Sequence, residues 1–288
     1  MLQIKAFFDT ATNTVTYLVW DTETRDAAII DPVLDFDPAA ARLTTQSADD
    51  VLSAVEAEGL NLVWVLDTHA HADHLSAADY IRGKTGAKVG ISARIADVQK
   101  TFTPVFGPVS DTPDPSLFDA LFEDGDTFPL GSLTVRVLYT PGHTSACISY
   151  LIEDAVFVGD TVFMPDYGTA RTDFPGGDAH ALYRSIRRLL ALPPETRIFV
   201  GHDYLPEDRD TPAWEATVAQ HRAANIHIHD GVSEADFVDL RTSRDKTLKA
   251  PRLILPSLQV NIRAGRLPEA ETDGHVYLRL PVNRLGGA

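Results

Sequence analysis

The chain has 288 residues, a formal net charge of −16, 44% hydrophobic residues and a single cysteine, Cys147. This charge argues against binding to nucleic acid or to an anionic membrane surface, because both would repel the protein. No apolar run approaches the ~20 residues that a membrane-spanning helix needs, and one cysteine excludes an internal disulfide framework. The N-terminus shows no basic region followed by a long apolar segment, so we expect a cytoplasmic protein.

The first part of the chain alternates apolar runs with polar turns. This pattern predicts strands over residues 4–8, 15–20, 27–30, 62–66 and 89–91 and helices over 47–59, 75–85 and 92–102, with Ser47 as a helix cap. Residues 103–126 contain several prolines and many acidic residues, which predicts a long surface loop with little regular structure.

The second part begins with two predicted hairpins and ends in helical patterns. We expect hairpins over 127–139 and 148–158, a strand over 198–200 and helices over 178–190, 211–225, 233–248 and 256–263. The first of these helices would be capped by Asp178. We find no internal repeat and no linker, so residues 1–288 are interpreted as one α/β domain. Its core would extend to about residue 205, and a helical C-terminal extension would follow from about 206 to 288.

One short stretch concentrates the chemistry of the chain. His69, His71, Asp73 and His74 lie within six residues, directly after the predicted buried strand 62–66. The cluster therefore lies on a loop at the carboxyl end of a strand, where open α/β sheets place their ligands. Imidazoles held this close repel each other when protonated, and a metal that keeps them neutral stabilises them. The stretch predicts a metal centre.

The same pattern, an apolar strand that ends in a polar side chain, recurs later in the chain. It precedes His143, Asp160 and His202. A glycine lies directly before each of these residues, and glycine lets the backbone turn tightly. A single pair of this kind is weak evidence, but its recurrence beside the histidine-rich stretch indicates one shared site.

This set of residues resembles the metallo-β-lactamase superfamily, over about residues 4–205. The resemblance implies an αββα sandwich with metals at one edge of two sheets. It also implies one metal on His69, His71 and His143, a second on Asp73, His74 and His202, and Asp160 as a bridge between them.

Three further matches are similar to persulfide dioxygenases within that superfamily. They are the stretch Gly168–Phe174, the position of Cys147 and the motif Gly201-His202-Asp203-Tyr204, and residues 255–265 look like bacterial members and hydrolase-like relatives. In that group one Fe(II) is held by two histidines and one aspartate, here His69, His143 and Asp160. This facial arrangement leaves three positions open for O₂ and the substrate sulfur. The other four ligand-type residues would then orient ligands and substrate, with Asp73 and His74 as the predicted catalytic pair.

The resemblance therefore implies an enzyme that oxidises glutathione persulfide, or a related small persulfide, with O₂ to sulfite. It would use one Fe(II) per chain. The alternative is a hydrolase of the glyoxalase II type, with one or two Zn(II) that activate water against a glutathione thioester. We find no characteristic C-terminal lysine-and-arginine glutathione site of glyoxalase II in the sequence. A non-catalytic metal-binding module is the third interpretation.

Three residues are predicted to contact the substrate: Arg171, Tyr204 and Cys147. Arg171 would grip a glutathione carboxylate with its planar fork. The alternatives are an ordinary surface arginine, a packing aromatic and a small buried residue, respectively. The partners expected are a small thiol persulfide or thioester and possible homodimerisation, without nucleic acid or membrane.

Overall fold

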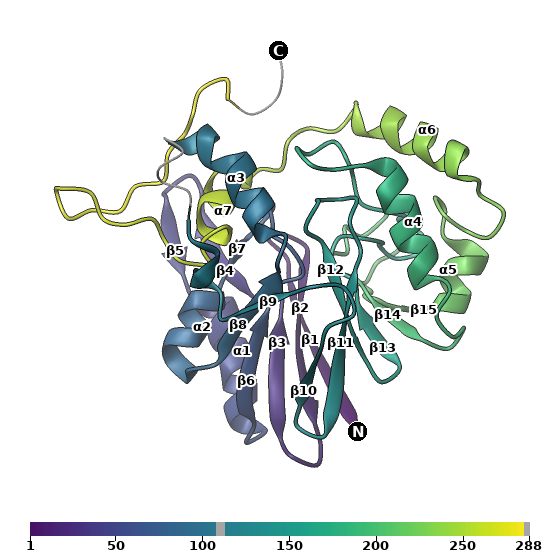
Figure 1. Ribbon diagram of the computed structural model, residues 1–288, viewed down its shortest axis with the longest axis horizontal. Helices are drawn as coiled ribbons and strands as arrows, with labels where there is room; N and C mark the ends of the chain where they lie inside the picture. The colour runs from purple at the N-terminus through teal and green to yellow at the C-terminus, as the bar shows by residue number, and fades with distance from the viewer. Residues whose placement is uncertain (108–112, 285–288) are drawn as a thin grey trace.

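The computed structural model describes residues 1–107 and 113–284. In this part of the chain, two six-stranded sheets pack face to face, with helices on the outer side of each (Figure 1). The first sheet has the order β1 (Leu2–Asp9), β2 (Thr14–Asp21), β3 (Asp26–Ile30), β6 (Asn61–Leu66), β8 (Lys88–Ser92) and β9 (Ala120–Phe122). The second has β10 (Thr127–Leu130), β11 (Leu133–Tyr139), β12 (Ile148–Ile152), β13 (Ala155–Phe157), β14 (Arg197–Phe199) and β15 (Glu215–Thr217).

Helices cover both outer faces. Those beside the first sheet are α1 (Gln46–Ala57), α2 (Ala78–Thr85), α3 (Ile95–Phe106) and α7 (Ile254–Asn261), and those beside the second are α4 (Ala179–Leu189), α5 (Val218–Ala224) and α6 (Glu234–Asp245) (Figure 1). The predicted αββα sandwich is confirmed. In the described residues, none of these helices has the length and apolar character needed to cross a membrane.

The core between the sheets contains an aromatic cluster. Tyr17 from the first sheet packs edge-on against Phe157 and Phe199 of the second, with ring centroids 5.1 and 5.5 Å away, and these two rings stack on each other. Its hydroxyl donates a hydrogen bond to the carbonyl of Val200 at 2.6 Å. Each face buries alternate residues of its strands, because successive side chains of a strand point to opposite sides. The packing fixes the two sheets against each other at the edge where the ligand-bearing loops emerge.

Most predicted elements are confirmed, but the stretch 103–126 is more regular than expected. Helix α3 runs through Pro104 to Phe106, and Ala120–Phe122 forms edge strand β9 beside β8. A 3₁₀ turn over Pro115–Leu117 precedes that strand. The loop prediction was wrong over these residues, because pairing with a neighbouring strand overrides local composition. Residues 108–112 lie outside the described part.

Two helix starts also differ from expectation. Thr45 rather than Ser47 precedes α1, because Asp35 accepts hydrogen bonds from both the amide and the hydroxyl of Ser47. The predicted helix 211–225 begins only at Val218, where Thr217 forms a capping box, and the residues before it pair as β15 with β14. The second sheet therefore continues beyond residue 205.

A small third sheet was not predicted. It consists of β4 (Val33–Asp37), β5 (Arg42–Thr44) and β7 (Leu75–Ser76), in the order β5-β4-β7. Because β7 takes the first residues of the predicted helix 75–85, α2 begins at Ala78. This pairing joins the histidine-rich loop to the chain that follows β3. The expected helix cap Asp178 is confirmed by hydrogen bonds from the first-turn amides, and Ser233, predicted as the first residue of a helix, caps α6 in the same way.

Candidate metal centre

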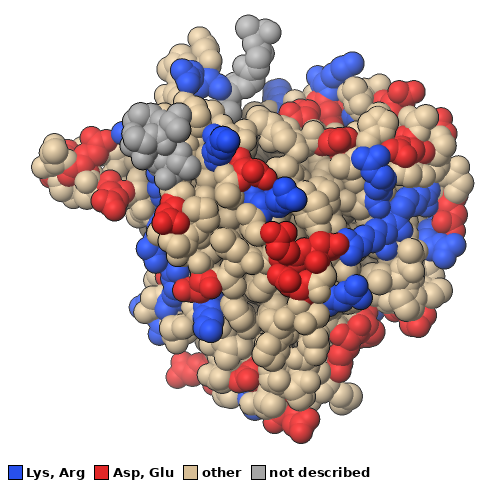
Figure 2. Space-filling view, viewed as in Figure 1, with Lys and Arg blue, Asp and Glu red and all other residues tan. Residues whose placement is uncertain are grey.

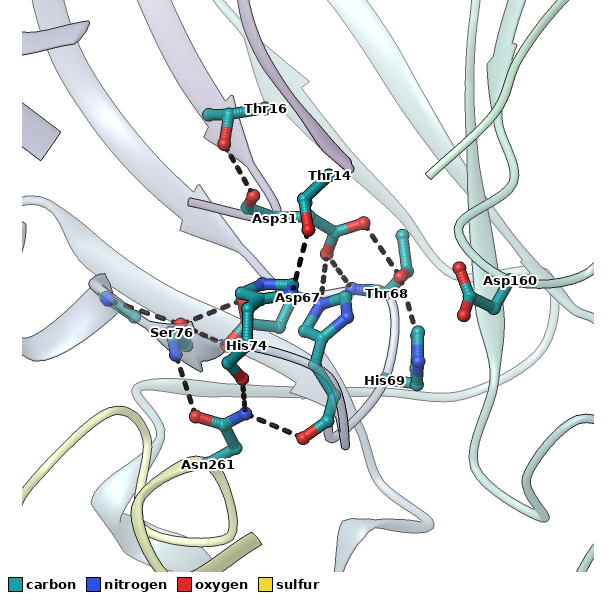
Figure 3. Close-up of polar contacts among 12 residues, drawn as sticks. Thr14, Thr16, Asp31, Asp67, Thr68, His69, His74, Ser76, Asp160 and Asn261 are labelled. Carbon is teal, nitrogen blue, oxygen red and sulfur yellow. Dashed lines mark hydrogen bonds and ion pairs between the residues drawn. The ribbon is translucent and has the colours of Figure 1, made fainter. Parts of the chain in front are cut away.

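All seven predicted ligands lie at one edge of the sandwich, on loops that follow the carboxyl ends of β6, β11, β13 and β14. Figure 3 shows three of them, His69, His74 and Asp160. They form two groups, and within each group the ligand atoms are within 4.8 Å of one another. We call them the three-ligand group, His69, His143 and Asp160, and the four-ligand group, His71, Asp73, His74 and His202. The structure thus brings together residues from four separate parts of the chain.

Buried ligand atoms without partners show that the site fits a cation. Within the described residues, the atoms without a hydrogen-bond partner include Nε2 of His69, His74 and His202, Nδ1 of His71 and Oδ1 of Asp160. Leaving a buried polar atom unpaired costs about 1–3 kcal/mol, so five such atoms in one place require a common partner. Imidazole nitrogens and carboxylate oxygens are the ligands that zinc and non-haem iron take.

Each histidine has its other ring nitrogen held by the protein. The contacts are His69 Nδ1 to Thr68 Oγ1 at 3.0 Å, His71 Nε2 to Asp31 Oδ1 at 2.9 Å, His74 Nδ1 to Asp73 Oδ2 at 3.0 Å, His143 Nδ1 to the Arg171 carbonyl at 2.8 Å and His202 Nδ1 to the Asn13 carbonyl at 3.3 Å. Such contacts orient the ring and fix which nitrogen is free to bind a metal.

Asp31 supports the site but was missed in the sequence. It ends β3, beside the parallel strand β6, and adopts a φ of 50°. Its carboxylate accepts hydrogen bonds from the amide and hydroxyl of Thr68, at 2.7 and 2.9 Å, and contacts His71 (Figure 3). Sequence reasoning treated Asp31-Pro32 only as the end of the meander. The available signal was an acidic residue at the end of an apolar strand, the same pattern used for Asp160.

Asn261 in α7 also supports the site and was missed in that role. Its Nδ2 donates to the carbonyls of His71 and His74, both at 2.8 Å, and its Oδ1 accepts from the amide of Ser76 at 2.7 Å (Figure 3). The hydroxyl of Ser76 in turn donates to the buried carboxyl of Asp67. The C-terminal segment therefore holds the shape of the histidine-rich loop.

The glycines beside the ligands are required by close packing. Gly159 has a φ of 49°, and a Cβ there would lie 2.2 Å from Thr68 Oγ1. A Cβ on Gly142 would lie 2.3 Å from the backbone of Leu182 in α4. Any side chain at either position would displace the loops that carry His143 and Asp160. The prediction that these glycines allow tight turns is confirmed.

The electrostatics of the two groups differ. Burial lowers the pKa of His69 well below its usual value, and the neighbouring imidazoles of His71 and His143 add to this effect. Burial also raises the pKa of Asp160, although the imidazoles of His202 and His143 act in the opposite direction. Burial therefore keeps His69 in the neutral form that binds a metal.

In the four-ligand group, a carboxylate and an imidazole stabilise each other's charge. Burial would raise the pKa of Asp73, but the imidazoles of His202 and His74 outweigh it and hold the pKa well below the usual value. Burial would lower the pKa of His202, but the carboxylates of Asp160 and Asp73 raise it. His202 Nε2 lies 3.3 Å from both Asp73 Oδ2 and Asp160 Oδ1. A protonated His202 would therefore neutralise part of this group.

A cavity of about 330 Å³ opens over the centre, and Asp73, His143 and Asp160 form part of its wall. We call it the charged cavity because basic side chains dominate the rest of its polar lining: Arg171, Arg241, Arg244, Lys249 and Arg252. Aromatic rings complete it, among them the predicted substrate residue Tyr204, which stacks on His202 with ring centroids 5.4 Å apart.

Arg171 lines this cavity but its guanidinium already has partners. Nε and Nη2 donate to the two carboxylate oxygens of Asp173, at 2.6 and 2.7 Å, and Nη1 donates to the carbonyl of Lys249 at 2.6 Å. Its contact with a substrate carboxylate stays a prediction. The third predicted residue, Cys147, does not line the charged cavity in the described part of the chain, and burial raises its pKa to about 12. Its Sγ lies 3.1 Å from Thr144 Oγ1.

A buried ion pair that the sequence analysis missed connects α6 to the site. Arg241 is 1% exposed and contacts Asp245 one turn later. Arg241 Nη1 donates to the carbonyl of Thr169 at 2.9 Å, and Asp245 Oδ2 accepts from the amide of Thr172 at 2.8 Å. The pair thus holds the backbone on both sides of Arg171 by hydrogen bonds, and the carbonyl of Arg171 orients His143. The spacing of four residues on a helix was the signal available.

The profile of the Metallo-beta-lactamase superfamily matches residues 9–202. The chain belongs to this superfamily. A solved superfamily structure, that of ETHE1 from Myxococcus xanthus, is 32% identical and aligns over 92% of this chain and 100% of its own, with a TM-score of 0.74.

The curated relatives include a hydrolase-like protein, a glyoxylase and a persulfide dioxygenase. The chain is 50% identical to the Beta-lactamase hydrolase-like protein of Xylella fastidiosa over 99% of its own length, and it spans 66% of that protein. It is 46% identical to Glyoxylase B2 of Dictyostelium discoideum, with 98% of each chain covered. It is 29% identical to human mitochondrial Persulfide dioxygenase ETHE1, over 91% of this chain and 88% of that protein. Metal-dependent enzymes of this superfamily are therefore its relatives.

Proposed function

We propose that this protein is a mononuclear non-haem iron persulfide dioxygenase that oxidises glutathione persulfide, or a related small persulfide, with O₂ to sulfite. The observation that carries the proposal is the separate convergence of His69, His143 and Asp160. Two histidines and one carboxylate are the ligand set of Fe(II) oxygenases. His71, which would join His69 and His143 at a zinc site of the hydrolase type, is grouped with the four-ligand set, and its ring centroid lies 4.1 Å from that of His69 and 4.2 Å from that of His74.

The site residues would have distinct tasks. His69, His143 and Asp160 would hold Fe(II), which would supply the chemistry that joins O₂ to the persulfide sulfur. His143 and Asp160 line the charged cavity, so a substrate in that cavity lies beside them. Asp73 lines it as well and contacts His74, which fits the predicted role of this pair in orienting substrate.

The basic residues of the charged cavity support an anionic substrate. The guanidiniums of Arg171 and Arg241 are paired with carboxylates, whereas Arg244, Lys249 and Arg252 have no ion-pair partner in the part of the chain that the structure describes. Unpaired cations beside a cavity attract carboxylates, and glutathione carries two. The sequence did not reveal this cluster as a glutathione site, because its members come from α6 and from the segment after it.

The basic residues on α4 provide a contrast. Blue side chains gather over α4 in Figure 2, where Arg184, Arg187 and Arg188 lie. Each forms an ion pair: with Glu234 at 3.3 Å, Asp230 at 3.6 Å and Asp124 at 2.8 Å, respectively. The charge of that patch is therefore largely cancelled, and the unpaired cations of the charged cavity are the better candidates for binding an anion.

A second candidate function has its own support. The four-ligand group offers three imidazoles and one carboxylate, several of them with unpartnered atoms, and such a set could hold a second metal. Two metals would make a hydrolase of the glyoxalase II type, in which zinc lowers the pKa of bound water to about 7. The 46% identity to Glyoxylase B2 supports this candidate.

Metal analysis combined with two assays separates the candidates. Protein purified without chelators should contain about one iron per chain, as expected of a single facial site, and should consume O₂ with glutathione persulfide. His143→Ala protein is the control and should do neither. Two tightly held zinc ions per chain, with hydrolysis of a glutathione thioester and no O₂ uptake, would contradict the proposal in favour of the hydrolase.

A further inference from the structure

A second, smaller cavity lies beside His143, and its lining is mainly hydrocarbon. Val98 and Phe102 reach it from α3, and Ile254 and Leu258 reach it from α7. We call it the apolar cavity. Its volume is about 10 Å³, which is at the lower limit of the roughly 10–15 Å³ that a site for one water-sized molecule needs.

The apolar cavity shares part of its wall with the charged cavity. Ala72, His143 and Phe174 line both. His143 is therefore reached from two spaces of opposite character, one lined by unpaired cations and one lined by aliphatic and aromatic side chains. Because His143 belongs to the three-ligand group, both spaces end at the same predicted reaction centre.

The polar side chains in the lining of the apolar cavity are engaged elsewhere. Thr144 Oγ1 accepts a hydrogen bond from the amide of Ala146 at 3.1 Å and contacts Cys147 Sγ. His143 Nδ1 contacts the carbonyl of Arg171 at 2.8 Å. A buried water needs two to four polar partners, and a cavity without them stays dry and takes apolar guests such as xenon. The apolar cavity therefore favours a small apolar molecule over water or an ion.

We propose that the apolar cavity binds O₂ beside His143. This inference rests on the proposed dioxygenase function, which requires one apolar and one anionic reactant. Burying an unpaired charge in a hydrocarbon lining is costly, so a persulfide with carboxylates is excluded from the apolar cavity. O₂ is uncharged and apolar and carries no such cost. The two reactants would thereby occupy separate spaces on either side of His143.

Xenon binding tests the cavity independently of catalysis. Crystals of the wild-type protein under xenon pressure should show xenon between Val98 and Leu258. Val98→Ile adds one methyl group to the lining and should abolish this xenon site. The matched control is Val51→Ile in α1, a residue that is 2% exposed, belongs to the same apolar core and does not line the cavity. Absence of xenon from the wild-type cavity would overturn the proposal.

Steady-state kinetics at varied O₂ concentration test whether the apolar cavity binds O₂ during turnover. One methyl group in an apolar pocket changes binding by about tenfold or more, so Val98→Ile should raise KM for O₂ by about tenfold. KM for glutathione persulfide and kcat at saturating O₂ should stay at the wild-type values, and Val51→Ile should change none of the three.

The outcomes separate this inference from the proposed function. Wild-type O₂ uptake with an unchanged KM for O₂ in Val98→Ile would refute the apolar cavity as an O₂ site and leave the dioxygenase intact. A raised KM for both reactants would mean that the substitution disturbs the centre as a whole, which also overturns the inference. No O₂ uptake by the wild-type protein would reject the proposed function and this inference together.

Discussion

The two ligand groups of this centre are built differently. The three-ligand group takes one residue from each of three loops, and two of its members, His143 and Asp160, line the charged cavity. The four-ligand group takes three residues from a single loop, and only Asp73 among the four is part of that wall in the described residues. The three-ligand group, assembled from distant parts of the chain, therefore contributes more residues to the wall of the charged cavity than the four-ligand group does.

The groups also differ in what holds them in place. The three-ligand group depends on α6, because Arg241 and Asp245 grip the segment whose carbonyl orients His143. The four-ligand group depends on α7, because Asn261 binds the carbonyls of His71 and His74. Two helices of the C-terminal segment thus support two parts of one centre.

The two groups also differ in the protonation of their histidines. A protonated His202 beside Asp73 and Asp160 offers the four-ligand group an internal cation. In the three-ligand group burial lowers the pKa of His69, so this imidazole stays neutral and available to a metal. Matched substitutions in the two groups should therefore have different effects on metal binding.

Removing one ligand from each group is the strongest test. His143→Ala should abolish iron binding, because it takes one of three protein ligands from the facial site. His74→Ala should leave substantial iron bound, because His74 belongs to the other group. Elemental analysis of both purified proteins measures the difference, and circular dichroism checks that both are folded. Equal loss of metal in the two variants would contradict a mononuclear site.

The next effect is on stability, through the helix that supports the four-ligand group. Asn261→Ala leaves the amide of Ser76 and the carbonyls of His71 and His74 without their partner. Each unpaired buried group costs about 1–3 kcal/mol, so the free energy of unfolding should fall by several kcal/mol. Urea denaturation measures it. The control Gln259→Ala removes a neighbouring α7 amide that contacts the Leu255 and Arg279 backbone, and it should leave the iron content unchanged.

Each ligand group has a histidine that contacts a threonine hydroxyl. Replacing that threonine by valine removes the contact with little change in side-chain size, so the two groups can be compared. Thr68→Val removes the contact to His69 Nδ1, and Thr14→Val removes the contact to His74 Nδ1 at 3.3 Å. Losing a group that orients a metal ligand lowers affinity about tenfold to a hundredfold. Iron affinity measured by chelator competition should fall by that factor in Thr68→Val and much less in Thr14→Val. The opposite order would place the metal in the four-ligand group.

The smallest effects concern substrate recognition in the charged cavity. Hydrogen bonds to charged groups are worth roughly 1.5–3 kcal/mol, so loss of a carboxylate contact should raise KM for glutathione persulfide on the order of tenfold to a hundredfold. Arg171→Lys tests the predicted fork, and Arg244→Gln tests an unpaired cation. Iron content should stay intact in both.

Steady-state O₂ uptake measures this effect, and an inorganic persulfide serves as the control substrate. It lacks carboxylates and should be affected much less. If only Arg244→Gln discriminates between the substrates, Arg171 acts through its pairing with Asp173, which fixes the loop. An equal loss on both substrates would show that the residue shapes the site in general.

The sequence by itself determined the seven ligand-type residues, and their resemblance to the metallo-β-lactamase superfamily implied the αββα class. Their signals are local: apolar runs of strand length, each followed by a glycine or by the histidine-rich stretch. The tight glycines were predictable for the same reason, since the residue type alone reports a backbone that must turn beside a ligand.

Only the tertiary structure decided how those ligands divide and what surrounds them. Asn261 contacts His71 across 190 residues of sequence, and Asp31 reaches it across 40. The unpaired cations of the charged cavity and the side chains of the apolar cavity come from elements that carry no shared sequence pattern. Such contacts depend on how helices and sheets pack, and local periodicity reports which face of an element is buried but not which partner covers it.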